Sequence, residues 1–579
     1  MKRHILTIAI MIALAFTCHL FAQNFELASE AFEVNTYNGK TEIRFSLPDY
    51  SLNTITKESE SFSRFDIRGT EMTTSEGLPE LPIFGITIAV PNNSNVKLIS
   101  ETATKKEYLD NVLIYPSQDD EDMQKSFAYN TRFYQDNTQY PEQSTIVSDI
   151  SVIRDYAFVN VNVLPFVYNA KNKQLEVNKE IKIVIEHNSS TSDNQYLINP
   201  KISRAFEPIY RAMFANYDQI RSSYPQYQKP TLLILYPTND QPLYLTELNK
   251  IINWKTQKGF NVKVATGTEI GTTTTSIKNY IQNAYDTWED KPEYIMLIGD
   301  ASAGAGFTLP TWTNTASYGA GDYPYTWLAG GSNDVFGDAI IGRLSIASID
   351  NFQTMVSKIM NYERAPTSEG TEWMNKNLLV GERYSNGISY VIINQYVKDL
   401  IHAFDENHTF TELYSTSPGA QNMVNAINSG GVLTFNFRGW IGMNGFGDTQ
   451  VNQLTNVKKL FNAVFLTCGT GNFDSSSIIE SVTRAGTAAQ PKGAITSVGL
   501  ATSSTHTAYN NALTGAIFHA MYEDNIPTMG GATLYAKYYI HRIYAATDLT
   551  QAKNFAHWLN LMGDPTINIY RTIAKTFSL

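Results

Sequence analysis

The spacing of apolar residues divides the chain into two parts. In the first third, short segments such as residues 40–45 and 180–186 alternate polar and apolar positions, and turn residues such as those at 91–93 separate them. Because successive side chains of a strand point to opposite faces, a period of two between turns predicts half-buried β-strands. We therefore predict an all-β domain over residues 23–199, followed by a linker over residues 200–229.

From residue 230 onward, short and almost continuous apolar runs are separated by amphipathic stretches. Residues 231–236, 294–298 and 461–467 are examples of these runs. Buried strands that alternate with helices are typical of a mostly parallel sheet covered by helices on both faces. The pattern predicts an α/β domain over residues 230–571.

Three of the predicted strands end at polar or reactive residues. One ends at Glu382, another at the turn Arg438-Gly439-Trp440, and a third just before Cys468. In open parallel sheets, ligands bind outside the carboxyl ends of the strands. We therefore expect these residues to meet at one edge of the sheet.

The start of the chain has the features of a signal peptide. Lys2 and Arg3 precede an apolar stretch over residues 5–21, and Ala22-Gln23 is a suitable cleavage point. An acyl chain on Cys18 is an alternative that the preceding residues do not favour. We predict a signal peptide over residues 1–22, an exported protein that is secreted or in the cell envelope, and no transmembrane segment, because no other stretch is long and apolar enough.

Composition narrows the function classes. The 579 residues are 43% hydrophobic and 17% charged, which is typical of a folded protein, and the net charge is -11. Nucleic-acid binding requires a basic surface, so an acidic chain without Lys/Arg runs argues against it. After removal of the leader only Cys468 remains, so no internal disulfide can form and the core must stabilise the fold.

Cys468 is the candidate nucleophile. It follows a buried strand and precedes Gly469 and Gly471, which would let a substrate backbone approach. A cysteine nucleophile must be a thiolate, and this normally requires a nearby base. His506 is the histidine that follows a predicted strand in the second half of the chain. The alternative interpretation is an inert, half-buried cysteine.

The chain contains six short segments of interest, in this order along the sequence: residues 77–82, 88–91, 294–300, 338–344, 465–473 and 562–566. Together they resemble the gingipain-type cysteine peptidase family, which shares its fold with caspases. The resemblance implies a caspase-like α/β domain behind a propeptide, and an exported cysteine endopeptidase made as a zymogen, with protein or peptide substrates and its own propeptide as inhibitor. Its cleavage preference stays open. The first two segments carry the resemblance to the propeptide, and the other four carry the resemblance to the peptidase domain.

The resemblance implies that Cys468 is the nucleophile and that Glu382 orients the base. The family has its basic histidine in a Gly-His-Gly setting, where this chain has Trp440. Tryptophan cannot accept a proton, because its one polar group is a donor. Three interpretations stay open: an inactive relative that binds peptide or a partner, a base from elsewhere with His506 as candidate, or slow turnover without a base. Loss of a general base costs about two to four orders of magnitude in rate.

Backbone N–H groups are expected to stabilise the oxyanion. The candidates are those of Cys468 and of the Gly439-Trp440 turn, with Gly469 beside the nucleophile. No cofactor is expected for catalysis. Because relatives bind calcium, a structural Ca²⁺ is expected in the acidic loop, where solvated turn residues are the alternative interpretation. Its predicted ligands are Asp322, Asn333, Asp334 and Asp338.

The all-β domain is best interpreted as a propeptide that caps the active site, often with a basic residue in the specificity pocket. Arg211, Arg221 and Lys229 in the linker are candidate processing sites. A permanent domain unrelated to inhibition is the alternative. The sequence ends soon after residue 570 without the C-terminal modules that many relatives carry, so we expect a shortened form or a fragment.

Overall fold

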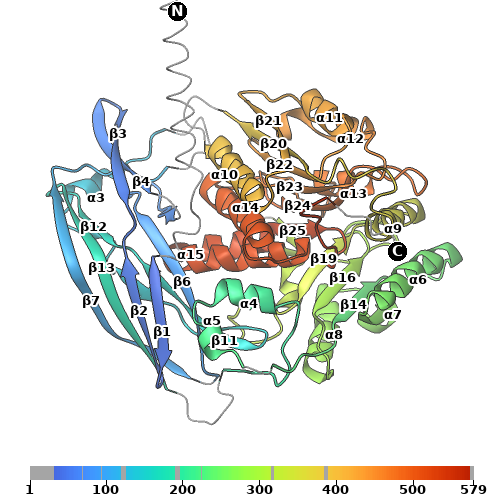
Figure 1. Ribbon diagram of the computed structural model, residues 1–579, viewed down its shortest axis with the longest axis horizontal. Coiled ribbons are helices and arrows are strands. Elements are labelled where there is room, and N and C mark those ends of the chain that lie inside the picture. The colour runs from blue at the N-terminus through green and yellow to red at the C-terminus, as the bar shows by residue number, and fades with distance from the viewer. Residues whose placement is uncertain are drawn as a thin grey trace, which may run out of the picture.

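The computed structural model describes residues 31–67, 70–92, 94–118, 126–188, 196–222, 225–314, 319–383 and 389–573. The predicted signal peptide lies outside these residues. A β domain (residues 31–188) and an α/β domain (residues 225–573) lie side by side, with helix α15 (Met529–Trp558) at their junction (Figure 1). Among the described residues, we find no helix that is both long and apolar enough to cross a membrane.

The β domain consists mainly of two packed antiparallel sheets. In β2, Ile43 and Phe45 are buried while Arg44 between them is exposed, as the alternating pattern predicts. Strands β6 and β11 are buried along their whole length, since one face packs on the first sheet and the other on the α/β domain. The first sheet contains β1 (Phe32–Tyr37), β2 (Lys40–Ser46), β13 (Gln174–Asn188), β12 (Phe166–Asn169), β8 (Gln139–Tyr140) and β7 (Asn95–Asp110); the second contains β10 (Ser151–Ile153), β11 (Tyr156–Val163), β6 (Pro82–Val90), β5 (Glu71–Met72) and β9 (Thr145–Val147).

Three smaller elements complete the β domain, and two short helices follow it. Strands β3 (Tyr50–Lys57) and β4 (Glu60–Ile67) form a separate hairpin, and α3 (Thr131–Gln135) is a single turn of helix. Helices α4 (Glu207–Met213) and α5 (Tyr217–Ile220) lie in the segment that the sequence indicates as a linker.

The α/β domain is built on one ten-stranded sheet. The sheet has two parallel halves, β15 to β25 and β24 to β21, which run in opposite directions because β25, the last strand of the chain, is inserted in the middle, parallel to β19 and antiparallel to β24. The mostly parallel α/β fold behind an all-β region is therefore confirmed. The sheet order is β15 (Asn261–Thr266), β14 (Thr231–Tyr236), β16 (Tyr294–Ile298), β19 (Ile340–Leu344), β25 (Leu559–Met562), β24 (Ala494–Leu500), β23 (Phe461–Phe465), β22 (Thr434–Arg438), β20 (Lys376–Glu382) and β21 (Thr409–Ser415).

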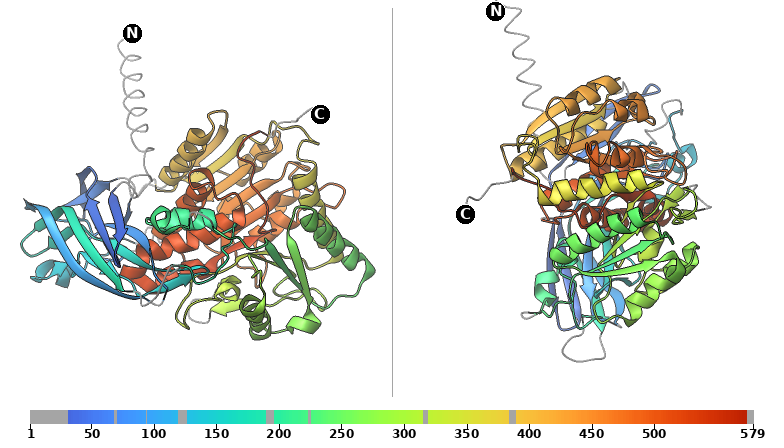
Figure 2. Two further views of the ribbon diagram at one scale, coloured as in Figure 1. Left: turned by 60° about the horizontal axis from the view of Figure 1, so that its bottom comes forward. Right: turned by 90° about the vertical axis from the view of Figure 1, so that its right-hand side faces the viewer.

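Helices cover both faces of this sheet (Figure 2). The apolar side chains of the central strands alternate between the cores on the two faces of the sheet. One face carries α6 (Pro242–Gln257), α9 (Ile349–Arg364), α10 (Ser389–Phe404), α14 (Thr507–Tyr522) and α15; the other carries α7 (Gly267–Ile270), α8 (Thr274–Thr287), α11 (Ala420–Asn428), α12 (Asp448–Asn452) and α13 (Ile478–Arg484).

Candidate active site

The predicted meeting of three strand ends is present in the structure. Strands β20, β22 and β23 are parallel neighbours, so the residues that follow them leave the sheet at one edge. Two hydrogen bonds join these residues: the Thr467 hydroxyl donates to the Gly439 carbonyl at 2.6 Å, and the Trp440 backbone N–H donates to a Glu382 carboxylate oxygen at 2.7 Å. Glu382, the Trp440 turn and the cysteine loop therefore form one connected site.

Cys468 lies half-buried at this edge. Its Sγ atom is 3.1 Å from the Oγ1 atom of Thr505, which comes from the loop after β24. The next residue, Gly469, has a φ of +70°, a conformation that favours glycine, so the chain can turn sharply after the thiol. Ile441, which is 47% exposed, lies beside Gly469, so the Trp440 turn and the cysteine loop pack against each other.

Glu382 shapes the turn that carries Trp440. The carboxylate is 2% exposed; one oxygen accepts the Trp440 N–H and the other accepts the side-chain amide of Asn444. The turn is strained, because all four residues from 442 to 445 have positive φ, including Met443 at 47° and Asn444 at 53°. A Cβ atom on Gly439 would lie 2.6 Å from the Glu382 carboxyl carbon, so only glycine fits there.

Two of the predicted oxyanion donors are engaged elsewhere. The N–H of Trp440 points to Glu382, and the N–H of Gly469 donates to the Thr502 carbonyl at 2.5 Å. Neither group is oriented toward an oxyanion, because each already has an acceptor within the protein. The role of the Gly439 and Cys468 backbone groups stays a prediction.

His506 lies in the loop that follows β24, one residue after Thr505. It is the N-cap of α14, where its Nδ1 atom accepts the Ala508 N–H at 3.2 Å, and its ring packs edge-on against Tyr509. The neighbouring residue Thr505 contacts the Cys468 sulfur at 3.1 Å. With Nδ1 as acceptor, a neutral ring carries its proton on Nε2, which is then a donor and not a base.

Three of the four residues predicted to bind calcium have hydrogen-bond donors within the protein. Asp322 forms an ion pair with Arg343, with two N–O distances of 2.7 Å, while the carboxylates of Asp334 and Asp338 accept backbone N–H groups at 2.7 to 3.0 Å. Asn333 is exposed. No cluster of three or more His, Cys, Asp or Glu able to hold a metal occurs in the described ranges, and a structural Ca²⁺ in this loop stays a prediction.

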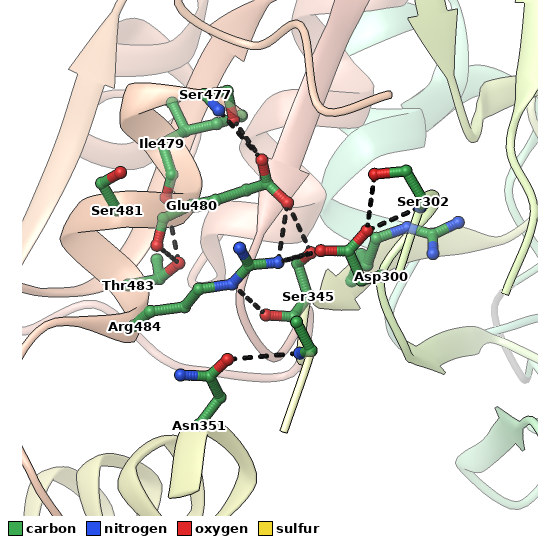
Figure 3. Close-up of polar contacts among 12 residues, drawn as sticks. Asp300, Ser302, Ser345, Asn351, Ser477, Ile479, Glu480, Ser481, Thr483 and Arg484 are labelled. Atoms are coloured by element: carbon green, nitrogen blue, oxygen red, sulfur yellow. Dashed lines mark hydrogen bonds and ion pairs between the residues drawn. The ribbon is translucent and has the colours of Figure 1, made fainter. Parts of the chain in front are cut away.

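A buried ionic cluster holds the helix that follows the cysteine loop (Figure 3). Arg484 of α13 forms ion pairs with Asp300 after β16 and with Glu480, 2.9 Å away. The Ser345 hydroxyl, after β19, donates to Glu480 at 2.6 Å, and burial raises the pKa of Glu480. The cluster ties α13 to the other half of the sheet. Of the residues in this cluster, only Asp300 lies within a segment that carries the family resemblance.

Both parts of the chain match known families. The sequence pattern of peptidase family C25 matches residues 226–570, and that of the C25 propeptide matches residues 30–223. The chain belongs to peptidase family C25. Its relatives include Gingipain R1 of Porphyromonas gingivalis, 25% identical over 529 residues that cover 86% of this chain and 50% of the relative, and Gingipain R2, 24% identical over 531 residues that cover 86% and 68%. The chain thus spans about half the length of Gingipain R1.

Solved structures show the same fold. The crystal structure of the Arg-specific cysteine proteinase gingipain R matches with a TM-score of 0.52 and 20% identity, over 59% of this chain and 78% of that one. A complex of the pro- and mature domains of RgpB from the same organism matches with a TM-score of 0.52 and 20% identity, over 58% and 79%. We refer below to the β domain as the propeptide and to the α/β domain as the peptidase domain.

The propeptide inserts the side chain of Arg154 into the peptidase domain. Arg154 is fully buried, and its guanidinium donates to the carbonyls of Lys291, Pro292 and Asp338 and to the side chain of Gln228 at 2.7 to 3.2 Å. These partners precede β14, β16 and β19, so they lie at the amino ends of the strands. Cys468 follows the carboxyl end of β23. Because β25 runs parallel to β19 and antiparallel to β24, the amino ends of β14, β16 and β19 lie at the same edge of the sheet as the carboxyl end of β23. The buried Arg154 therefore anchors the propeptide at the edge of the sheet that also carries the cysteine loop.

The propeptide also contacts helices α14 and α15. The Glu71 carboxylate accepts hydrogen bonds from the hydroxyls of Tyr539 and Tyr544 at 3.4 and 3.3 Å, and burial raises the pKa of Glu71 to about 7. Thr74 contacts the Tyr509 hydroxyl at 2.9 Å, three residues beyond His506. This contact brings the propeptide close to the edge that carries Cys468.

Proposed function

We propose that the chain is the zymogen of an exported cysteine endopeptidase with Cys468 as its nucleophile. The observation that carries the proposal is a half-exposed thiol after β23, at the carboxyl edge of a C25 peptidase domain. The Cys468 thiolate attacks a peptide carbonyl, the amine leaves with a proton, and water releases the acyl group from sulfur. Family membership and the position of the half-buried cysteine at this edge support this assignment.

The proton chemistry differs from that expected for the family. The Trp440 indole is a donor, so the thiol proton must leave to solvent or to His506 in the tautomer whose Nε2 is unprotonated. That tautomer gives up the Nδ1 contact with the Ala508 N–H, which is an energetic cost. We therefore propose turnover that is slow relative to an enzyme with a positioned histidine.

We propose that the propeptide keeps the peptidase latent and is removed by cleavage after Arg221. The C25 propeptide and peptidase matches leave a gap between residues 223 and 226, next to this residue. Arg211 lies inside helix α4, and the Lys229 N–H is bonded to Asp290 just before β14, so both are less suited to enter a protease as extended chain. Export through residues 1–22 places the zymogen in the secreted or envelope compartment.

A peptide library tests this proposal. The purified chain, processed at the linker, is incubated with mixed peptides, and new termini are identified by mass spectrometry for wild type, Cys468→Ala and Cys468→Ser. Cleavage by wild type alone supports the peptidase and reveals its preference before the cut. Equal product patterns for wild type and Cys468→Ala contradict it.

Trp440 supports a second candidate, a non-catalytic protein of the cell envelope that binds peptide or a partner. Glu382 here holds the backbone of the Trp440 turn. A protein that has lost the catalytic histidine can keep the loops after β20, β22 and β23 as a binding surface. Binding at these loops does not require the thiol. Binding of library peptides without cleavage, unchanged in Cys468→Ala, is the result that this alternative predicts.

A further inference from the structure

The Cys468 sulfur has a hydroxyl neighbour that is itself held by a buried amide. Thr505 is 7% exposed, and its Oγ1 atom lies 3.1 Å from Sγ. The side-chain amide of Asn510, fully buried in α14, donates to the same oxygen at 2.8 Å. An amide nitrogen is only a donor, so the threonine oxygen accepts on that side. On its other side, the Thr505 hydroxyl hydrogen can reach the Cys468 sulfur.

We propose that Thr505, oriented by Asn510, is a positioning residue that donates its hydroxyl hydrogen to the Cys468 thiolate. The inference rests on the proposed function and deepens it, because it names a group that stabilises the nucleophile where the histidine is missing. Threonine keeps its proton throughout: the thiol proton leaves to solvent or to a base, and the hydrogen bond then stabilises the anion that remains. Hydrogen bonds to charged groups are stronger than those between neutral groups, so the contact favours thiolate over thiol.

Some of the charged groups near the Cys468 sulfur favour the thiolate, and others favour the thiol. Arg438, at the end of β22, donates to the carbonyl of Leu466, two residues before Cys468, and Thr505 immediately precedes the N-cap of α14. A cation and the positive end of a helix both favour a thiolate. Glu382, on the far side of the Trp440 turn, opposes it, and His506 adds positive charge when protonated. Because all of these groups stay in place when Thr505 is changed, substitution isolates the hydroxyl.

The test compares Thr505→Val with Thr505→Ser in the full chain. Valine keeps the shape and removes the hydroxyl, whereas serine restores it. The rate of alkylation of Cys468 by iodoacetamide is measured from pH 5 to 10 by mass spectrometry of the Cys468 peptide, with Cys468→Ala as a blank and thermal unfolding as a check on folding. We expect the valine variant to raise the thiol pKa by about one unit and slow alkylation about tenfold below that pKa, with serine close to wild type.

An unchanged or lower thiol pKa in Thr505→Val, or a serine variant that behaves like valine, overturns the inference. If valine prevents folding, Asn510→Ala provides the second measurement and should shift the thiol pKa in the same direction by a smaller amount. Alkylation requires no turnover, so these outcomes are independent of peptide cleavage. A chain that cleaves peptides with an unaltered thiol pKa in the valine variant refutes this inference alone, and an absence of cleavage refutes the proposed function alone.

Discussion

The Oε2 atom of Glu382 lies 2.7 Å from the backbone nitrogen of Trp440. The carboxylate that by family resemblance would orient a histidine ring thus binds the backbone of the residue at that position. Together with its contact to Asn444, this bond holds a turn of four positive-φ residues next to the thiol. The turn that would position a histidine is present, but Trp440 occupies the position where the family resemblance implies that histidine.

Restoring the histidine should therefore increase activity. In Trp440→His, Glu382 and the strained turn stay in place, and an imidazole replaces the indole next to the cysteine loop. We expect peptide hydrolysis to rise by about two orders of magnitude, the lower end of what a general base contributes. The measurement is kcat/KM on the best library peptide, with Trp440→Phe as the matched control. A folded Trp440→His variant that is no faster than Trp440→Phe contradicts this prediction.

Glu382 should also matter for stability. Both of its oxygens face donors, so Glu382→Gln turns an amide NH₂ toward either the Trp440 N–H or Asn444 and leaves one buried donor without an acceptor. We expect a loss of about 1–3 kcal/mol in the free energy of unfolding, measured by urea denaturation. Glu369→Gln, at a surface ion pair with Lys458, is the control and should change it by less than about 1 kcal/mol. Equal effects in the two variants would show that the Glu382 contacts add no stability.

Arg154 should anchor the propeptide. Arg154→Met removes the guanidinium from a fully buried site and leaves several acceptors of the peptidase domain unpaired. We expect a cost of about 3–5 kcal/mol, seen as release of the cleaved propeptide during gel filtration. Arg132→Met is the matched control, because that side chain is 93% exposed and belongs to the same domain. Retention of the propeptide by Arg154→Met would mean that other contacts hold it.

Propeptide docking should weaken as the pH rises. The pKa of Glu71 rises from 4.5 to about 7 on burial. An acid with a raised folded-state pKa stabilises the structure in its protonated form, so its contribution is complete below pH 4.5 and is lost as the pH increases through about 7. Burial raises the pKa of Asp334, which accepts the Val152 N–H of the propeptide, to about 7 as well, so it acts in the same direction.

The variant Glu71→Gln mimics the protonated acid and tests this linkage. We expect it to match wild type in thermal unfolding at pH 5 and to be more stable by about 2 kcal/mol at pH 8. Glu76→Gln, on the neighbouring exposed loop, is the control for a lost charge. A difference between Glu71→Gln and wild type that is the same at both pH values would rule out Glu71 as the titrating group.

Features set by local patterns could be predicted from the sequence. The apolar runs before Glu382, Trp440 and Cys468 placed these residues at strand ends, and the rule for parallel sheets placed the ends together. The alternating segments predicted the all-β region. Strand β25 was missed because four residues directly after a long helix give no separate pattern, so its antiparallel insertion was not expected.

Features that depend on contacts between distant segments could not be predicted. The sequence indicates Asp338 as a possible calcium ligand because it is an acidic residue in an acidic loop. In the structure its carboxylate accepts backbone N–H groups, one of them from Arg154. Arg154 reaches partners more than a hundred residues away, and no local signal marks it among the other cations. Thr505, one residue before the predicted His506, contacts the sulfur, and a contact of this kind depends on how the loop enters α14.

The most direct test of the central claim is the rate at which a peptidyl electrophile labels Cys468 in the processed protein. A peptidase groove around the thiol predicts labelling that is much faster than that of a free peptide thiol, that peptide substrate suppresses, and that is absent in Cys468→Ala. Labelling at the rate of a free thiol, without competition by peptide, would contradict the peptidase assignment.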